Sequence, residues 1–255
     1  MGAVPRRQSG VDRNVSVEKS MILEALQNGE INLQGQFLNS SNYTFLTQLT
    51  YQEMEFKVVY KPVKGEMPLW DFPTGTLAQR ETAAYGLSEA LGWNLVPPTV
   101  FRKKAVLGPG SLQYYVEHDP NYHFFEFKPE DRQRLRPVVV FDLLVNNADR
   151  KGGHVLVSAD NQLFLIDHGI CFNREPKLRT VIWDFAGEQI PQNLLADVER
   201  ITGQLEQKTG IYMDLRRYLS AREVESLCER GQQILVQRVF PYPDPQRRPY
   251  PWPPV

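Results

Sequence analysis

The sequence has few cysteines, almost no net charge and no long apolar run. Among its 255 residues only Cys171 and Cys228 are cysteines, so a disulfide framework is excluded, and both are interpreted as structural thiols in a reducing cytoplasm. Lys and Arg number 29 against 30 Asp and Glu. The resulting net charge of −1 argues against a sequence-independent nucleic-acid binder, because such a protein needs a basic excess. No apolar run approaches the roughly 20 residues that cross a bilayer.

The first half of the chain has the patterning of a sheet accompanied by two helices. Residues 1–16 are polar and are expected to be disordered. Helices are predicted from residue 17 to Asn28 and over 77–91, where an alanine-rich run ends at Gly92. A hairpin connection is predicted at 53–55. The predicted strands cover residues 31–38, 43–50, 56–61, 96–101 and 112–117.

The second half is predicted to be more helical. One helix is expected to run from Asp131 through Val145, and two or three more within 191–236. Between them, 155–157 and 163–166 have the pattern of a short hairpin. The last 15 residues, 241–255, contain seven of the 19 prolines. They are interpreted as an extended, disordered end that could be a ligand for a partner's aromatic-lined groove.

Two carboxylates stand where buried elements end. Asp149 lies in a polar loop after a buried helix, and Asp167 follows a buried strand and precedes His168-Gly169. A buried carboxylate costs several kcal/mol unless it is paired or bound to a metal. Two such groups, 18 residues apart, suggest a divalent cation beside a catalytic base. Phosphoryl transfer requires that combination.

The surrounding sequence, FDLLVNNADRKGGHVLV followed by LFLIDHGICF, resembles the catalytic loop and metal motif of the protein-kinase-like superfamily. The phosphatidylinositol 3/4-kinase-like and HipA-like branch is the most similar. The resemblance implies that Asp149 is the catalytic aspartate and Asp167 the Mg²⁺ ligand. His154 takes the place of the family's metal-binding Asn, and Lys151 replaces its loop His. A neutral imidazole suits Mn²⁺ better than Mg²⁺. His168 would fill the motif's aromatic slot, as a packing residue.

The same resemblance supplies an ATP-binding lysine. Lys61 ends a predicted strand, as the family's lysine does, and would reach the α- and β-phosphates of ATP. Glu81, 20 residues later in the predicted helix, could pair with Lys61 and hold it in place.

Further ATP contacts are implied at the hinge and at a turn. The backbone of Val116 and Glu117 would hydrogen-bond adenine. Ser40 and Ser41 lie between the first two strands, where a phosphate-covering loop belongs, and their hydroxyls could cap phosphates.

The expected fold is therefore α+β and two-lobed, protein-kinase-like, with a strand-rich lobe at 17–117, a small helical lobe at 118–240 and ATP between them. The expected activity is transfer of the γ-phosphoryl group of ATP, with Mg²⁺ or Mn²⁺, to a hydroxyl of a small molecule or a protein. Three alternatives remain open. They are a pseudokinase that binds nucleotide without turnover, an interaction protein that acts through its tail, and a metal-dependent hydrolase using Asp149, His154, Asp167 and His168.

Overall fold

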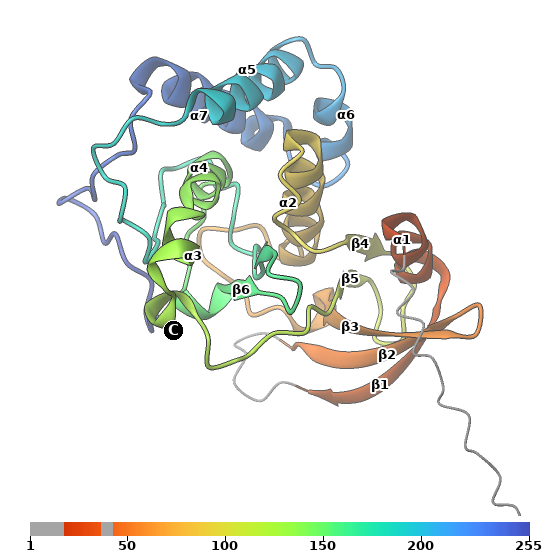
Figure 1. The fold of residues 1–255 in the computed structure, drawn as a ribbon. Helices are drawn as coiled ribbons and strands as arrows, with labels where there is room; N and C mark the ends of the chain where they lie inside the picture. Colours follow the sequence, from red (N-terminus) through yellow and green to blue (C-terminus); the bar gives the residue numbers. More distant parts are fainter. Residues whose placement is uncertain (1–17, 37–42) are drawn as a thin grey trace, which may run out of the picture.

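A five-stranded antiparallel sheet forms one end of the molecule (Figure 1). The computed structural model describes residues 18–36 and 43–255, so the expectations for 1–16, Ser40 and Ser41 lie outside the described residues. The strand order in the sheet is β1-β2-β3-β5-β4. The strands are β1 (Glu30–Gln36), β2 (Phe45–Tyr51), β3 (Met54–Pro62), β4 (Thr99–Arg102) and β5 (Gly110–Tyr114). Helix α1 (Lys19–Asn28) packs against this sheet.

The hairpin between β2 and β3 differs from its prediction. Its turn is formed by Gln52 and Glu53, which have φ angles of 48° and 65°, and β3 already begins at Met54. Two consecutive residues with positive φ match the right-handed twist of the flanking strands, which is why such turns are favoured in hairpins. The turn therefore lies at residues 52–53 and not at the predicted 53–55.

The alternation of side chains along β3 places Lys61 on the face opposite to the sheet's own core. Val58 and Tyr60 are fully buried in a cluster with Leu26 of α1. Because successive residues of a strand point to opposite faces, Lys61 projects away from that cluster. It therefore points toward the rest of the molecule.

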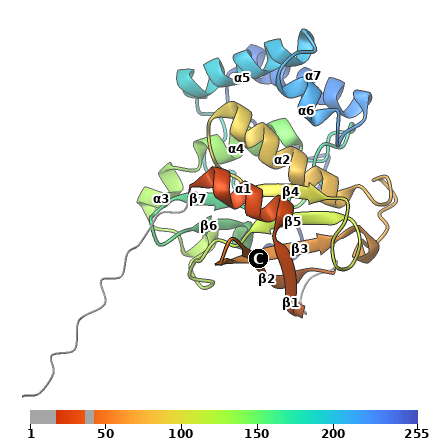
Figure 2. The same ribbon diagram turned by 90° about the vertical axis from the view of Figure 1, so that its right-hand side faces the viewer.

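Helix α2 (Leu77–Leu91) lies between the sheet and the helices formed by the last third of the chain (Figures 1 and 2). It has the predicted bounds, and Gly92 ends it with a φ of 78°, a left-handed conformation that glycine adopts without a Cβ penalty. Leu87 and Leu91 are buried in the core that the helices of the second half build. The helix thus connects the sheet to this core.

The helix predicted from Asp131 to Val145 is broken in two. Helix α3 (Pro129–Gln133) ends before α4 (Arg136–Val145) begins. Pro137 lies in the first turn of α4, where its missing N–H costs nothing. In a continuous helix its ring would clash with the carbonyl of Gln133, four residues earlier. The other elements of the second half are β6 (Val155–Val157), β7 (Leu163–Leu165), α5 (Gln192–Glu206), α6 (Ile211–Leu215) and α7 (Ala221–Gln237).

The carboxy-terminal segment 241–255 packs onto the protein, so the prediction of a disordered end is wrong. The Thr180 N–H donates to the carbonyl of Pro249 (3.0 Å), and the Gly152 N–H donates to that of Pro254 (2.8 Å). Pro251 is buried. The backbone partners that hold this segment are distant in sequence, so its local composition did not indicate them. Among the described residues, no helix is long and apolar enough to cross a membrane.

Candidate active site

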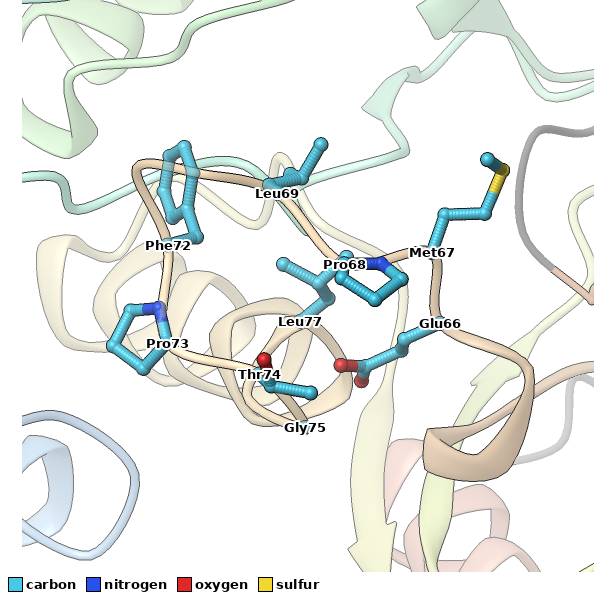
Figure 3. A pocket seen from close by; sticks show the side chains of 9 residues that line it. All are labelled: Glu66, Met67, Pro68, Leu69, Phe72, Pro73, Thr74, Gly75 and Leu77. Carbon is cyan, nitrogen blue, oxygen red and sulfur yellow. The ribbon is translucent and has the colours of Figure 1, made fainter.

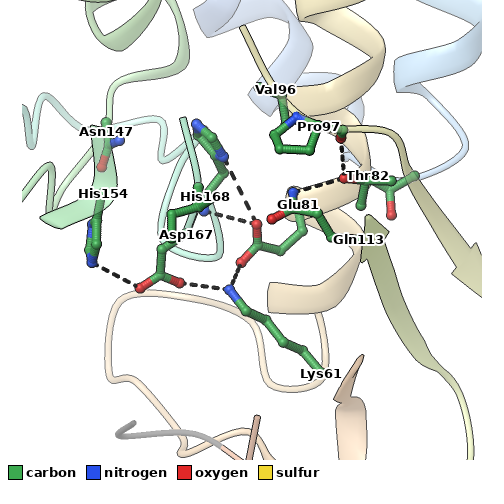
Figure 4. Close-up of polar contacts among 12 residues, drawn as sticks. Lys61, Glu81, Thr82, Val96, Pro97, Gln113, Asn147, His154, Asp167 and His168 are labelled. Carbon is green, nitrogen blue, oxygen red and sulfur yellow. Dashed lines mark hydrogen bonds and ion pairs between the residues drawn. The ribbon is translucent and has the colours of Figure 1, made fainter. Parts of the chain in front are cut away.

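Three charged side chains meet where α2, β3 and the residues after β7 approach each other (Figure 4). The ammonium of Lys61 lies 2.5 Å from Oε1 of Glu81 and 2.8 Å from Oδ1 of Asp167. Although burial opposes its charge, the two carboxylates raise the pKa of Lys61, so it is a cation at neutral pH. The pairing of Lys61 with Glu81, expected from the resemblance, is present in the structure.

Asp167 is the exposed member of this cluster. Its side chain is 50% exposed, whereas that of Glu81 is 4% exposed. The charge of Lys61 holds the pKa of Asp167 far below its usual range. The backbone of Asp167, which follows the hairpin β6–β7, has a φ of 62°, a conformation uncommon outside glycine. A permanently ionised, accessible carboxylate is the kind of oxygen ligand that hard divalent cations take.

His154 approaches the other oxygen of Asp167. It ends a 3-10 turn, Gly152–His154, and its Nε2 lies 3.4 Å from Oδ2 of Asp167. Burial lowers the pKa of His154 to about 4, so the imidazole is neutral at pH 7. Its Nδ1 accepts a hydrogen bond from the Lys151 N–H (3.4 Å), which places the ring proton on Nε2. Binding a metal through Nε2 therefore requires the other tautomer.

Asp149 lies beside this cluster with a carboxylate suited to accept protons. Its N–H donates to Oδ1 of Asn147 (2.9 Å), and its Oδ2 lies 3.7 Å from the Lys151 ammonium. Burial raises the pKa of Asp149 to about 6, while Lys151 opposes that rise and Asp167 adds to it. A general base functions best when its pKa lies near the working pH, and this shift moves Asp149 toward it.

Arg150 is the organising residue of the loop, and no role was predicted for it. Its side chain is fully buried and pairs with Asp142 of α4, with 2.9 Å between Nε and Oδ2. The same guanidinium donates to the carbonyls of His154 (3.2 Å) and Ile166 (2.9 Å). One side chain thus connects the loop carrying Asp149 to the end of β7. The sequence contains one indication of this role: Asp142 lies in a predicted buried helix, and Arg150, which could pair with it, follows eight residues later.

His168 has the predicted packing role, with polar contacts in addition. Its ring is fully buried and packs edge-on against Phe141. The backbone N–H of His168 donates to Oε2 of Glu81 (2.9 Å), and the ring Nε2 lies 2.9 Å from Nη2 of Arg150. Burial and the charge of Arg150 lower the pKa of His168 well below its usual value. The ring is fully buried and its Nε2 is bonded to Arg150, so it does not fit the metal-ligand role that the hydrolase alternative needs.

The structure does not bring the predicted adenine-binding residues into the charged cluster. Val116 and Glu117 follow β5, where the chain leaves the sheet. The carboxylate of Glu117 pairs with Lys57 (2.6 Å) on the exposed surface, and the carbonyl of Val116 lies 2.8 Å from Nδ1 of His118. Their proposed role involves backbone atoms, and it stays a prediction.

The loop between β3 and α2 holds the first turn of the helix that carries Glu81. Oε1 of Glu66 accepts the Ala78 N–H (2.9 Å), which satisfies one of the free donors at the start of α2. Figure 3 shows the carboxylate of Glu66 turned into this loop. The cavity that the loop encloses, about 10 Å³, has room for about one water molecule, so it is no nucleotide site.

Among the described residues, no group of three or more His, Cys, Asp and Glu side chains could hold a metal ion by itself. Asp167 and His154 offer two ligands only. Such a pair fits a divalent metal whose remaining ligands are water and substrate phosphates, as at phosphoryl-transfer sites.

Comparisons with known proteins identify a family for the chain. The model of the family described as phosphatidylinositol 3- and 4-kinase matches residues 74–223, which include Glu81, Asp149 and Asp167. Protein Rv2133c of Mycobacterium tuberculosis is 38% identical over 264 residues, covering 89% of this chain and 93% of that protein. Phosphatidylinositol 4-kinase gamma 4 of Oryza sativa subsp. japonica is 28% identical over 127 residues, covering 43% of this chain but only 22% of the rice protein.

A solved structure shares the fold. The crystal structure of the Golgi casein kinase with Mn/ADP bound superposes with a TM-score of 0.55 at 13% sequence identity, covering 93% of this chain and 80% of that one. At this identity the likeness concerns the fold alone. It confirms the predicted mixture of an antiparallel sheet and helices in a kinase-like arrangement. The HipA-like part of the resemblance stays a prediction.

Proposed function

Because the chain belongs to the phosphatidylinositol 3- and 4-kinase family, we propose that it is an ATP-dependent phosphotransferase that moves the γ-phosphoryl group to a hydroxyl acceptor. The kinase-like fold and the family domain support a kinase-type phosphotransferase. The observation that carries the proposal is the position of Lys61, whose ammonium contacts both Glu81 and Asp167. In this class of site such a lysine positions phosphates.

In this proposal each residue of the site has a separate role. Glu81 accepts the backbone N–H of His168 and fixes the ammonium of Lys61. That ammonium neutralises charge on the α- and β-phosphates. Asp149 orients the acceptor hydroxyl and accepts its proton, for which its raised pKa is suited. The two-lobed division, with ATP between residues 17–117 and 118–240, is part of the same proposal. So are adenine contacts from Val116 and Glu117.

Asp167, with His154 in its second tautomer, would hold Mg²⁺ or Mn²⁺. When bound, such a metal neutralises charge on the phosphates. The casein kinase structure with Mn/ADP supports a metal-nucleotide pair as the ligand. Since imidazole nitrogen is a better ligand for Mn²⁺ than for Mg²⁺, we expect tighter binding with Mn²⁺.

A nucleotide-binding protein without turnover is the second candidate. It is favoured by His154, whose ring proton faces Asp167 where a metal would bind. The two candidates share the nucleotide site and differ in whether Asp149 acts on an acceptor.

The test is ATP turnover by the purified chain with Mg²⁺ and with Mn²⁺, beside Asp149→Asn. We expect ADP and phosphorylated product from the wild type and a loss of at least about 100-fold in the variant, because general-base assistance contributes on that order. The control is Asp160→Asn, in the exposed turn of the hairpin β6–β7. Nucleotide binding without any turnover would favour the second candidate. Equal turnover by wild type and Asp149→Asn would contradict the assignment of Asp149.

A further inference from the structure

The end of the chain reaches the loop that carries the proposed catalytic residues. In Figure 1 the blue segment leaves α7 at the top of the molecule and returns to the level of β6. The contact with the loop is a hydrogen bond from the Gly152 N–H to the carbonyl of Pro254 (2.8 Å). Gly152 begins the 3-10 turn that ends at His154. The first N–H groups of a helical turn have no partner inside it, so an outside acceptor fixes the turn in place.

The approach at Gly152 is close. A Cβ at this position would lie 2.9 Å from the ring of Phe125 and 3.5 Å from the Pro254 carbonyl oxygen. Only a residue without a side chain fits between these neighbours without a shift. The bond is therefore part of a packed contact, and Gly152 is itself buried.

Further contacts hold the segment along its course. The carbonyl of Phe240 accepts the Gly187 N–H, and the Phe240 N–H donates to the backbone carbonyl of Glu188 (both 2.9 Å). Phe240 is fully buried and lies 5.6 Å from Phe185, measured between ring centroids. Nη1 of Arg247 donates to the carbonyl of Pro176 (2.8 Å). The segment is thus anchored before it reaches the loop.

A second, indirect connection runs through residues 179–181. The Thr180 N–H donates to Pro249 (3.0 Å), while its two neighbours bond to the catalytic loop. The carbonyl of Arg179 accepts the Arg150 N–H (2.9 Å), and the Val181 N–H donates to the carbonyl of Arg150 (3.1 Å). The backbone at 179–181 is therefore held between the terminal segment and the loop.

We propose that the carboxy-terminal segment is a positioning element of the active site, in which the Pro254 carbonyl holds the Gly152–His154 turn and so sets His154 against Asp167. This inference rests on the proposed function, because its consequence is a change in metal-dependent turnover. Pro254 touches neither substrate nor metal in this account and acts through Gly152.

Two truncations that differ by one residue test it. A chain ending at Pro254 keeps the acceptor, since its new terminal carboxylate includes that carbonyl oxygen, and serves as the matched control. A chain ending at Pro253 removes it. Both keep Phe240, Arg247 and Pro249, so both should fold with similar melting temperatures.

We expect the chain ending at Pro253 to turn over ATP about 3- to 10-fold more slowly, which is the effect of losing one hydrogen bond. The Mn²⁺ concentration that gives half-maximal rate should rise as His154 moves. The KM for ATP at saturating Mn²⁺ should stay unchanged, because Lys61 and Glu81 are untouched. Hydrogen exchange in peptides covering 149–156 should become faster. If the segment had only a structural role, its loss would lower the melting temperature without raising the half-maximal Mn²⁺ concentration at an unchanged KM for ATP.

Equal exchange over 149–156 in the two truncated chains would overturn the proposal, whatever their activity. Faster exchange with unchanged turnover and unchanged Mn²⁺ dependence would also overturn it, while leaving the proposed function intact. If the full chain turns over no ATP, the proposed function fails, and binding of Mn²⁺ with ADP replaces turnover as the readout. In that case weaker Mn²⁺-dependent binding together with faster exchange supports the positioning role, and unchanged binding contradicts it.

Discussion

Nη2 of Arg150 lies 2.9 Å from Nε2 of His168, at the centre of the structure's buried polar network. Since a guanidinium can only donate, Nε2 of His168 is the acceptor, and the ring carries its proton on Nδ1. Oε2 of Glu81 lies 3.9 Å from that Nδ1. That distance is too long for a hydrogen bond, and Nδ1 has no partner among the described residues. His168 connects Arg150 of the catalytic loop to Glu81, the partner of Lys61, through its ring Nε2 and its backbone N–H, which donates to Oε2 of Glu81 (2.9 Å).

Replacing Arg150 by Lys should destabilise the protein strongly. A single ammonium cannot serve Asp142, the two carbonyls and His168 together, and removal of a buried charge's partner costs about 3–5 kcal/mol. Because Lys keeps the charge, we expect a loss of about 2–4 kcal/mol in the free energy of unfolding, measured by urea denaturation. Arg136→Lys is the matched control. Its partner Glu188 is half exposed, so the loss there should stay below about 1 kcal/mol.

A loss below about 1 kcal/mol for Arg150→Lys as well would contradict the central place given to its guanidinium. His168→Phe adds a second check. It keeps the packing against Phe141 and removes the acceptor for Arg150, so a moderate destabilisation is expected.

Glu223 should make stability depend on pH on the acid side. It lies in the first turn of α7 and forms an ion pair with the buried Arg80 of α2. Burial raises the pKa of Glu223, but Arg80 and the hydrogen bonds from Ser220 outweigh it, so the net pKa is lower than the usual 4.5. A lowered pKa stabilises the folded state above the unfolded pKa, and this contribution disappears as the pH falls through the folded pKa.

Glu223→Gln should therefore unfold more easily at pH 7, by about 1–3 kcal/mol, and lose part of the decline in stability below pH 4.5. Thermal unfolding between pH 3 and 7 measures both effects. Glu225→Gln, an exposed position of the same helix, should change neither. If the stability of Glu223→Gln declined below pH 4.5 as steeply as that of the wild type, other carboxylates would be responsible for the acid sensitivity.

The rate of phosphotransfer should rise with pH through the pKa of Asp149. Burial raises that pKa to about 6, and only the ionised carboxylate can accept the hydroxyl proton. We expect kcat to increase about tenfold per pH unit below 6 and to level off above it, since one deprotonation controls the rate. The measurement is kcat at saturating ATP and Mn²⁺ from pH 5 to 8. A rate independent of pH over this range would exclude Asp149 as the base.

Replacing Lys61 by Met should abolish turnover while leaving the fold intact. The change removes the cation that positions phosphates and leaves the almost fully buried carboxylate of Glu81 without its ion pair. Turnover should fall by more than about 100-fold, and the free energy of unfolding by about 1–3 kcal/mol. The control is Lys57→Met, because Lys57 is exposed and lies four residues earlier on the same face of β3. Turnover by Lys61→Met comparable to that of the control would contradict the assigned role.

Much of this fold follows from local sequence patterns. Helix α2 has the predicted bounds because its alanine-rich run and Gly92 act locally, and the hairpin β6–β7 follows from two short apolar runs on either side of a turn. The order of strands in the sheet, with β5 between β3 and β4, depends on contacts between distant segments that no local pattern shows. The break at Pro137 could have been predicted, because proline restricts the helix regardless of its surroundings.

The site was predicted through spacing and family resemblance, and only in part. Lys61 and Glu81 meet as expected, with Asp167 and His154 beside them. The contacts of Arg150 and the return of the terminal segment to Gly152 were missed. The return of the segment and two of the contacts of Arg150 depend on backbone carbonyls, which every residue has, so the residue types do not reveal which ones accept. The pairing of Arg150 with Asp142, by contrast, joins two side chains.

The nucleotide site is tested most directly by the thermal stability of the chain with ATP and Mn²⁺ or Mg²⁺, measured beside Asp167→Ala. At 100 times its Kd, a ligand stabilises the folded state by about 2.7 kcal/mol, which raises the melting temperature by several degrees. We expect a rise that needs both nucleotide and metal and is lost in Asp167→Ala. No rise with either metal, or an equal rise in the variant, would contradict the nucleotide site built around Lys61 and Asp167.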